Sequence, residues 1–404
     1  MSTITYIYII GDSEIDLWGL SGRERLKRMV SASQNAQLVE HPDKIPTRSP
    51  ALLIYANHLY DTRVIAALIN AQENMVLCNH NGYPVAIRTK GNEVAAILPD
   101  LLREGNKRTI ANLPKKMVGE LTLDTQSNLL KKDPPYLWPI TRENRITLES
   151  ELFSGSYKGV TDLVTKWLWP FPAFWATHLC IHYGWRPNHV TYLSIILAAL
   201  AGFAFWHGFF VLGLLMGWFM TFLDTVDGKL ARVTVTSTKL GDVLDHGLDL
   251  IHPPLWYAAW AVGLATTLHP LGNVTFYIWL IFIGYIGGRL CEGAFQFWLA
   301  SFSLFVWQQK DSFNRLITAR RNPNLILLTF GCLMGRPDVG FYLVVLWHLA
   351  STIYLGSRVL TAWRMYRRDG ALSSWIENVD FSQGRKTLAE KVFTRKPLDL
   401  KDCS

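Results

Sequence analysis

Four aspartates stand close together near the middle of the chain, in two pairs. Asp224 and Asp227 are three positions apart, and Asp245 and Asp249 are four positions apart. Each spacing places the two carboxylates of a pair on one face of an α-helix. The four acids repel one another, and an unpaired aspartate inside a bilayer costs about 2.5–3.5 kcal/mol. We therefore predict that a positive charge lies among them.

The donor atoms indicate what this positive charge is. Carboxylate oxygens without a histidine or cysteine cluster favour a hard cation such as Mg²⁺ or Mn²⁺. Two such ions bridge phosphate oxygens and activate an attacking oxygen. The competing interpretation is a chance cluster of helix-end acids that cap membrane spans, but capping requires neither four acids nor this spacing. We predict a site for two divalent ions.

The same segment matches a longer pattern, D-x2-D-G-x2-A-R-x8-G-x3-D-x3-D. Its fixed positions are Asp224, Asp227, Gly228, Ala231, Arg232, Gly241, Asp245 and Asp249. The pattern resembles the signature of the CDP-alcohol phosphotransferases, also called CDP-alcohol phosphatidyltransferases. The run Pro187-Asn188-His189-Val190-Thr191 resembles the same family. The resemblance covers about residues 160–365.

The resemblance implies a reaction and roles for the acids. The family moves a phospho-alcohol group from a CDP-linked donor to an acceptor hydroxyl and releases CMP. By position, Asp224, Asp227 and Asp245 would hold the metals. Asp249 would complete the second metal site and accept the proton of the acceptor, which makes it the catalytic residue.

The resemblance also implies a set of substrate contacts. Gly228 would let the nucleotide approach the backbone, and Arg232 would face the diphosphate. Asn188, Thr191 and Thr238 fall where the family contacts the CDP moiety. The chemistry agrees, since a glycine permits close approach and an arginine neutralises phosphate charge.

Helices that cross a membrane must position these groups. Half of the 404 residues are hydrophobic and 18% are charged, which excludes a disordered chain and a small disulfide scaffold. About 20 apolar residues span a bilayer as a helix. The long uncharged stretches predict about six transmembrane helices, near residues 189–207, 209–232, 241–266, 273–298, 322–337 and 339–363.

Basic residues and tryptophans indicate how these helices sit in the membrane. The turns near 207 and 270 carry no lysine or arginine, whereas the alternate loops do. This alternation predicts a multi-pass protein of the cell inner membrane with both termini cytoplasmic. The segment around Lys166, Trp175 and Trp185 predicts an interfacial helix, with ordinary core aromatics as the alternative. No signal peptide is expected.

Residues 1–150 predict a soluble α/β N-terminal domain, residues 151–368 the membrane domain, and residues 369–404 a cytoplasmic tail that is surface-bound or mobile. The predicted strands are Thr3–Ile10, Ala51–Tyr55, Asn74–Cys78 and Tyr83–Arg88. The predicted helices are Gly22–Ala36, Asp61–Ala71 and Asn92–Glu104. Their alternation predicts a largely parallel sheet. Residues 106–155 are polar and predict a linker or loose extension.

The N-terminal segments 19–26 and 53–61 resemble parts of sugar-nucleotide-type nucleotidyltransferases, which some transferases of this class carry as a fused domain. Two departures matter. The run Ile10-Gly11-Asp12-Ser13 replaces a glycine-rich phosphate loop, and Asn57 replaces a metal-binding aspartate. Nucleotidyl transfer then lacks its electrostatic support. We predict a degenerate domain with a regulatory, docking or stabilising role.

A second polar set lies in and after the fourth span. Arg289 and Glu292 are three positions apart, and Arg315, Arg320 and Arg321 follow. Two interpretations of Arg289 stay open, a site for an anionic acceptor or headgroup and an internal ion pair. For the three later arginines we expect ordinary positive charge of a cytoplasmic loop.

The expected function is transfer of a substituted phosphate from a CDP-alcohol, CDP-diacylglycerol or a CDP-polyol, to an acceptor hydroxyl in phospholipid biosynthesis. The expected partners are these two substrates, membrane lipids and a second copy in a homodimer, without nucleic acid. The alternatives are a bifunctional enzyme that also makes the CDP-alcohol, a membrane transporter, and a non-catalytic scaffold. Clustering of the acids at one end of the spans disfavours transport.

Overall fold

A computed structural model describes residues 4–102, 113–121, 130–237, 239–379, 384 and 387–396. The side chains of residues 100, 102, 239–246 and 248 lie outside this description. The chain divides into two compact units. The N-terminal unit is Met1–Thr125 with Asp133–Leu152 and Val233–Thr236, and the helical unit is Gln126–Lys132, Phe153–Arg232 and Ser237–Ser404.

The N-terminal unit is built on a six-stranded sheet with the order β2-β1-β3-β6-β5-β7. Its strands are β1 Thr5–Ile10, β2 Ala36–Leu38, β3 Pro50–Tyr55, β5 Met75–Cys78, β6 Pro84–Lys90 and β7 Lys115–Lys116. β4 (His58–Tyr60) and β8 (Leu137–Pro139) form a separate antiparallel pair. Pairs β1–β2, β1–β3 and β5–β7 are parallel, and β6 runs antiparallel to β3 and β5. The prediction of a largely parallel sheet is therefore corrected to a mixed sheet, because β6 returns beside β5 through a short turn.

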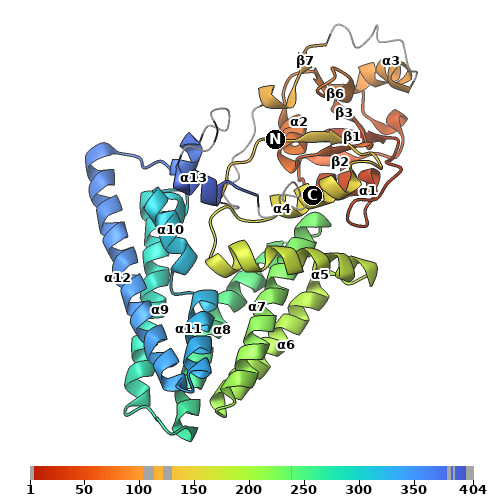
Figure 1. The fold of residues 1–404 in the computed structure, drawn as a ribbon. Coiled ribbons are helices and arrows are strands. Elements are labelled where there is room, and N and C mark those ends of the chain that lie inside the picture. Colours follow the sequence, from red (N-terminus) through yellow and green to blue (C-terminus); the bar gives the residue numbers. More distant parts are fainter. Residues whose placement is uncertain are drawn as a thin grey trace. The chain divides into compact units, whose positions relative to one another are not determined.

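Helices cover both faces of this sheet, as expected for an α/β unit (Figure 1). Apolar side chains of α1 (Gly22–Ser31) and α2 (Thr62–Asn70) pack with Ile7, Ile9 and Leu52 on one face. Those of α3 (Gly91–Leu102) pack with Leu53 and Ile87 on the other face. The alternation of side chains along β1 and β3 sends successive residues to opposite faces and so builds two cores from the same strands. The predicted helices and strands are confirmed, with ends that differ by a few residues.

The segment predicted to be a linker is more ordered than expected. Within residues 130–155, β8 pairs with β4, and α4 (Arg145–Gly155) is a helix. Glu149 on α4 accepts hydrogen bonds from the backbone N–H of Trp18, and its carbonyl accepts from the indole N–H. Trp18 is almost fully buried, so this contact gives a polar stretch a fixed tertiary position. The prediction was wrong for this part, and residues 106–112 and 122–129 lie outside the described residues.

The helical unit places a helix at each of the six predicted spans. They are α6 (Pro187–Trp206), α7 (Phe210–Val233), α8 (Lys239–Gly263), α9 (Val274–Ala294), α11 (Arg321–Leu333) and α12 (Pro337–Asp369). Within the described residues, four helices are long and apolar enough to cross a membrane: Pro187–Trp206, Phe210–Val233, Val274–Trp298 and Pro337–Asp369. The chain is therefore a multi-pass membrane protein with four candidate spans. α11 is short, since 13 residues rise only about 20 Å against a hydrocarbon core of about 30 Å.

The helices meet along apolar faces and leave others to lipid. Figure 1 shows α9 beside α12 and α11 beside α12, and α6 also packs on α8. Gly208 closes the turn between α6 and α7 with φ +79°, and a Cβ there would lie 2.2 Å from the hydroxyl of Thr266. Large apolar side chains remain exposed along the spans, among them Tyr192, Phe203, Leu215, Trp279, Ile283 and Ile353. Such a surface is stable only against hydrocarbon or another apolar partner.

A row of aromatic residues precedes the first span. The π-helix Val164–Leu168 leads into α5 (Pro170–His182). Trp167 and Trp175 are each 60% exposed, which contradicts the alternative of ordinary core aromatics for these two rings, whereas Trp169 packs on Trp218 and Phe222. Exposed aromatic rings beside a lysine suit the membrane interface.

The described part of the tail packs on the helical unit. The short helix Trp375–Asn378 and α13 (Leu388–Phe393) contact α10 (Gln309–Ile317) and the turn Leu304–Val306 before it. Ser374 donates to the carbonyl of Val306, and the Trp375 indole donates to the hydroxyl of Ser312. Of the two expectations for the tail, the surface-bound one is confirmed for these residues.

Candidate functional site

Two of the predicted metal ligands come together across two helices. Asp224 lies on α7 and Asp249 on α8, and one guanidinium group bridges them. Nη2 of Arg321 lies 2.5 Å from Oδ2 of Asp224, and Nη1 lies 2.6 Å from Oδ1 of Asp249. Arg321 is the first residue of α11, so three helices meet at this point. A positive charge, that of Arg321, thus lies between two of the four predicted acids, and the predicted metal site stays a prediction.

This arrangement tests whether the residues fit a divalent cation. The donor atoms are carboxylate oxygens, which hard cations prefer. The guanidinium occupies the space between two carboxylates, where its charge stands in for that of a cation. Asp224 and Arg321 expose only 18% and 14% of their side chains, so their charges must be balanced locally. The residues therefore fit Mg²⁺ or Mn²⁺, which would replace the guanidinium as counter-charge.

Asp227 is tied to the start of α6. The hydroxyl of Thr191 donates to Oδ2 of Asp227 at 2.7 Å, and the aspartate is buried. Thr191 lies one turn into α6, because Pro187 begins the helix with a fixed φ and no unmet N–H. Asn188, in the first turn of the same helix, is exposed. The two segments that carry the resemblance are thus joined by a direct hydrogen bond.

Gly228 and Arg232 lie one turn apart on α7. A Cβ at Gly228 would lie 3.5 Å from a guanidinium nitrogen of Arg232, so the glycine leaves room beside that side chain. Arg232 donates to the carbonyl of Ser156 at 3.3 Å, and Lys229 donates to the same carbonyl at 3.2 Å. The ammonium of Lys229 also stands 3.6 Å over the Tyr157 ring. Two cations therefore converge on one side of the helix that carries Asp224 and Asp227.

Two predicted residues cannot be placed. Thr238 and the side chain of Asp245 lie outside the described residues. Among the residues that the structure does describe, no group of three or more histidine, cysteine, aspartate or glutamate side chains gathers as a metal cluster. The predicted four-acid site is therefore visible as the Asp224–Asp249 pair and the separate Asp227–Thr191 contact.

The second polar set forms partly buried ion pairs. Nη1 of Arg289 lies 3.3 Å from Oε2 of Glu292, and Arg320 pairs with the same carboxylate oxygen. The internal ion pair is thus present, as one interpretation of Arg289 expected. Arg320 and Arg321 are engaged with acids inside the unit, so the expectation that they are ordinary loop charge is corrected.

Asp162 links the segment before the first span to the start of α11. Its carboxylate accepts from the side-chain amide of Asn322 at 3.0 Å and from the N–H of Thr165 at 3.0 Å. Burial raises the pKa of Asp162, but the charge of Arg315 and these hydrogen bonds outweigh burial, so the pKa is lowered. The ionised form of Asp162 thereby anchors the residue next to Arg321.

Arg321 is the residue that the sequence analysis missed. It stands 97 positions from Asp224 and 72 from Asp249, so no local spacing connects them. The available signal was weak. A basic residue at the start of a short apolar segment is common in cytoplasmic loops, and its neighbour Arg320 carries the same charge.

The N-terminal unit has its own polar cluster after β1. Oδ1 of Asp12 accepts the backbone N–H groups of Ser13 at 2.7 Å and Arg23 at 2.9 Å. Oδ2 accepts from the hydroxyl of Ser21, which is the N-cap of α1. The carboxylate of Asp12 therefore occupies the N-terminus of α1, where helices bind anions.

Close packing fixes this cluster. Gly22 begins α1 against the end of β3, and a Cβ there would lie 1.8 Å from the carbonyl oxygen of Ala56. Its N–H donates to the hydroxyl of Ser13 at 2.7 Å. Asn57, where a metal-binding aspartate was expected, lies with its amide oxygen 2.8 Å from Nδ1 of His58. Burial lowers the pKa of His58 to about 4, so the ring is neutral at pH 7.

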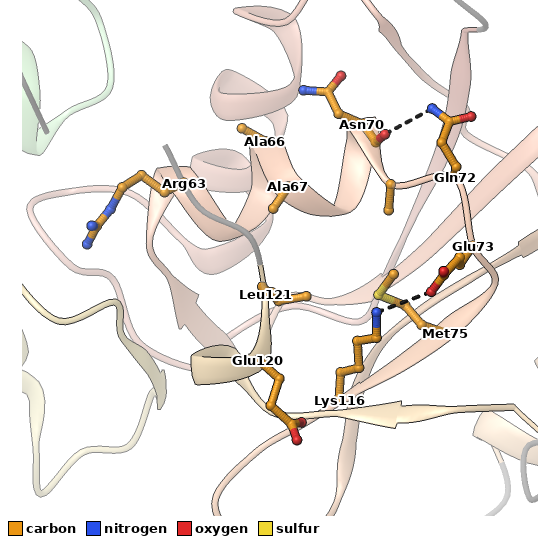
Figure 2. A pocket seen from close by; sticks show the side chains of 11 residues that line it. Arg63, Ala66, Ala67, Asn70, Gln72, Glu73, Met75, Lys116, Glu120 and Leu121 are labelled. Atoms are coloured by element: carbon orange, nitrogen blue, oxygen red, sulfur yellow. Dashed lines mark hydrogen bonds and ion pairs between the residues drawn. The ribbon is translucent and has the colours of Figure 1, made fainter. Parts of the chain in front are cut away.

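A cavity of about 390 Å³ lies elsewhere in the N-terminal unit, between α2 and β7 (Figure 2). Its charged side chains already have partners. Lys116 pairs with Glu73 at 3.2 Å, as Figure 2 shows, and Arg63 pairs with Asp61 at 2.6 Å. The polar groups around this cavity thus satisfy one another.

Comparison with known proteins agrees with the geometry of the helical unit. Residues 185–363 match the model of the family described as CDP-alcohol phosphatidyltransferase. The match includes α6 to α9 and α11, most of α12, and the Asp224–Arg321–Asp249 bridge. No curated protein was found to match the chain. Residues 185–363 therefore form a CDP-alcohol phosphatidyltransferase domain.

Proposed function

We propose that this enzyme transfers a substituted phosphate group from CDP-diacylglycerol or a CDP-polyol to an acceptor hydroxyl and releases CMP, in phospholipid biosynthesis. The observation that carries the proposal is the bridge between Asp224 and Asp249. Two acids from separate helices share one positive charge inside a matched family domain. Such an arrangement suits a diphosphate substrate, which brings negative charge and requires positive charge around it.

The chain's own residues supply most of the machinery in this proposal. The carboxylate of Asp249 accepts the proton of the acceptor hydroxyl. The acceptor oxygen forms a bond to the phosphorus that carries the alcohol, and the P–O bond to CMP breaks. Arg232 neutralises charge on the diphosphate, and Gly228 leaves space beside it. Asn188, Thr191 and Thr238 contact the CDP moiety.

The metal ligands in this proposal are Asp224, Asp227, Asp245 and Asp249. These carboxylates would hold two divalent ions, which would supply positive charge to the phosphate oxygens and to the attacking hydroxyl. Thr191 keeps the carboxylate of Asp227 in a fixed orientation through its hydrogen bond. Asp224 and Asp249 would then exchange the guanidinium of Arg321 for the charge of the metal.

We also propose that the N-terminal unit, predicted as residues 1–150, is a degenerate nucleotidyltransferase-like domain that does not make the CDP-alcohol. The Asp12 carboxylate fills the N-terminus of α1, which supports this proposal. The Asn57–His58 pair brings no negative charge for a metal. The unit would act in docking, regulation or stabilisation of the membrane domain, which we propose to extend over residues 151–368.

The test is CMP release by the purified full chain in lipid, with CDP-diacylglycerol and CDP-linked polyols as donors and a panel of acceptor alcohols. Asp249→Asn removes the proton acceptor and one metal ligand at nearly constant volume. We expect its CMP release to fall by about 10²–10⁴-fold. Asp369→Asn, at the exposed end of α12, is the matched control and should keep wild-type turnover.

Three outcomes separate the alternatives. Metal-dependent release that Asp249→Asn abolishes supports the transferase and identifies the donor. Flux of a solute through liposomes without CMP release would favour a transporter. Release of CDP-alcohol from CTP and a phospho-alcohol would establish the bifunctional enzyme. Labelling of cysteines from each side and chemical cross-linking in lipid test the proposed cytoplasmic termini and homodimer.

A further inference from the structure

Two adjacent prolines follow the proposed catalytic acid on α8. Pro253 and Pro254 lie inside the continuous helix Lys239–Gly263. A proline has no N–H, so the carbonyl four residues before it loses its helical hydrogen bond. The carbonyls that lose their donors here are those of Asp249 and Leu250. Unpaired carbonyls are costly in an apolar environment, where no water replaces the missing bond.

A tyrosine from the next helix supplies the missing donor. The hydroxyl of Tyr285 on α9 donates to the carbonyl of Leu250 at 2.9 Å, and it lies 3.3 Å from the carbonyl of Asp249. Tyr285 is 5% exposed, so this hydroxyl is directed into the protein. One side chain therefore serves both carbonyls that the two prolines leave unpaired.

The ring of Tyr285 has contacts that do not involve its hydroxyl. It packs edge-to-face with His348 of α12 at a centroid distance of 5.9 Å. The guanidinium of Arg289 lies 5.3 Å from its centroid. A phenylalanine keeps the ring packing, and it loses the bonds of the hydroxyl to α8 together with the interaction of the hydroxyl with Arg289. The hydroxyl can thus be tested separately from the packing.

We infer that Tyr285 is a positioning residue, which fixes the backbone of α8 at Asp249 so that this carboxylate faces Asp224. The inference rests on the proposed role of Asp249. The side chain of Asp249 is held by Arg321 at 2.6 Å. In the proposed function, this contact is exchanged for one to the metal. The hydrogen bond from the Tyr285 hydroxyl to the backbone of α8 does not involve the guanidinium of Arg321. It therefore holds the backbone at Asp249 in place while metal replaces Arg321.

The prolines explain why this bond matters at this place. A helix with intact hydrogen bonds keeps its own geometry, whereas the turn at Asp249–Pro253 lacks two of these bonds and depends more on its neighbours. Displacement of a reacting group by about 1 Å can cost about a hundredfold in rate. Loss of one hydroxyl at this turn therefore affects the site although that hydroxyl touches no substrate.

The test is a cycle of variants in the full chain in lipid. Tyr285→Phe removes the donor. Pro253→Ala with Pro254→Ala returns backbone N–H groups to the carbonyls of Asp249 and Leu250, so the tyrosine becomes dispensable. Tyr277→Phe, two turns earlier on α9, is the matched control, because the Tyr277 ring packs on Tyr342 of α12. Each protein is measured for Mn²⁺ affinity by electron paramagnetic resonance and for kcat and donor KM of CMP release.

In the natural background we expect Tyr285→Phe to weaken Mn²⁺ binding by about tenfold, as outer-shell changes do. We expect kcat to fall by about tenfold with donor KM unchanged within about twofold, because the acid is displaced while the CDP contacts stay. In the double-alanine background both effects should shrink to less than about twofold. Tyr277→Phe should match wild type in every measurement.

Other results would overturn the inference. Equal losses on Tyr285→Phe in both backgrounds would mean that the hydroxyl acts elsewhere. Wild-type Mn²⁺ affinity and kcat in Tyr285→Phe would mean that Asp249 needs no such support. A wild-type protein that releases no CMP would contradict the proposed function. If Tyr285→Phe still weakened Mn²⁺ binding in the natural background and not in the double-alanine background, the positioning of Asp249 would hold nevertheless.

Discussion

In both units aspartates lie beside the first residues of a helix, α11 in the helical unit and α1 in the N-terminal unit, but their charges are balanced in opposite ways. In the helical unit, Asp224 and Asp249 are balanced by the side chain of Arg321. In the N-terminal unit, Asp12 is balanced by the backbone N–H groups of Ser13 and Arg23. A side chain can swing away when another cation arrives, whereas backbone groups within a packed turn cannot.

This difference separates a site that can exchange partners from one that is closed. The bridged aspartates would remain charged and available after Arg321 moves. The N-terminus of α1 already holds its anion, and Gly22 is pressed against Ala56 without space for a further group. Similar residue types thus suit the proposed exchange of partners in one unit and a fixed helix start in the other.

The largest effect that would sharpen this comparison is expected for Arg321→Gln. Without metal, the variant leaves two acids without their counter-charge. We expect a loss of about 2 kcal/mol of stability, below the ~3–5 kcal/mol of a fully buried pair because the Asp249 side chain is 43% exposed. Mn²⁺ should restore most of this loss, since it supplies the missing charge. Thermal unfolding with EDTA and with Mn²⁺ measures both.

The control for Arg321→Gln is Arg320→Gln. Arg320 pairs with Glu292, which is not among the proposed metal ligands. This variant should also be destabilised, but Mn²⁺ should not recover the loss. Equal recovery in both variants would show that Mn²⁺ stabilises the unit generally, and the distinction between exchangeable and fixed partners would fail.

A smaller effect is expected for Asp12→Ala in the N-terminal unit. The variant removes the acceptor for two backbone N–H groups at α1, and we expect a loss of about 1 kcal/mol in stability, as for a helix cap. CMP release should stay within about twofold of wild type, because the residue stabilises the fold. Denaturant unfolding and the CMP assay measure these. Stabilisation of wild type by CTP with Mg²⁺, absent from the variant, would instead indicate a working nucleotide site.

Apolar runs and their breaks predicted most of the helical unit. The six helices begin and end near the predicted residues because glycine, proline and charged residues interrupt long apolar stretches. In contrast, the Arg321 bridge joins residues 97 and 72 positions apart. Tertiary packing alone decides which arginine of the 315–321 segment reaches the acids. The partner of the two α8 prolines, Tyr285, was hidden for the same reason.

The N-terminal unit was predictable in its elements and less so in their pairing. Strand periodicity finds β3, β5 and β6 but does not state direction, so the antiparallel β6 was missed. α4 was missed because the charged and proline-containing run before it indicates a loop. Its helix is fixed by Glu149 against Trp18, a contact across 131 positions. Local pattern carries neither pairing direction nor such long-range contacts.

The smallest effect expected concerns pH and His58, beside the asparagine that stands in place of an expected aspartate. Burial lowers the pKa of His58 to about 4 in the folded unit, against about 6.5 for an unfolded chain. The unfolded chain therefore takes up the proton first. The contribution to stability is complete above about pH 6.5 and is lost as pH falls toward 4.

Between pH 7.5 and 5.5 this linkage would amount to about 1.3 kcal/mol for a fully buried group, and we expect about 0.7 kcal/mol because His58 is only half-buried. His58→Gln should remove this pH dependence, and His80→Gln, at an exposed position, should keep it. Hydrogen exchange of peptides from β3 and β4, corrected for the intrinsic effect of pH, measures the change.

A carboxylate at position 57 would raise the pKa of His58 and abolish the effect, so Asn57→Asp should resemble His58→Gln. Equal protection of wild type from exchange at both pH values would show that His58 gains a compensating partner when it is charged. The description of the Asn57–His58 pair as neutral would then be wrong.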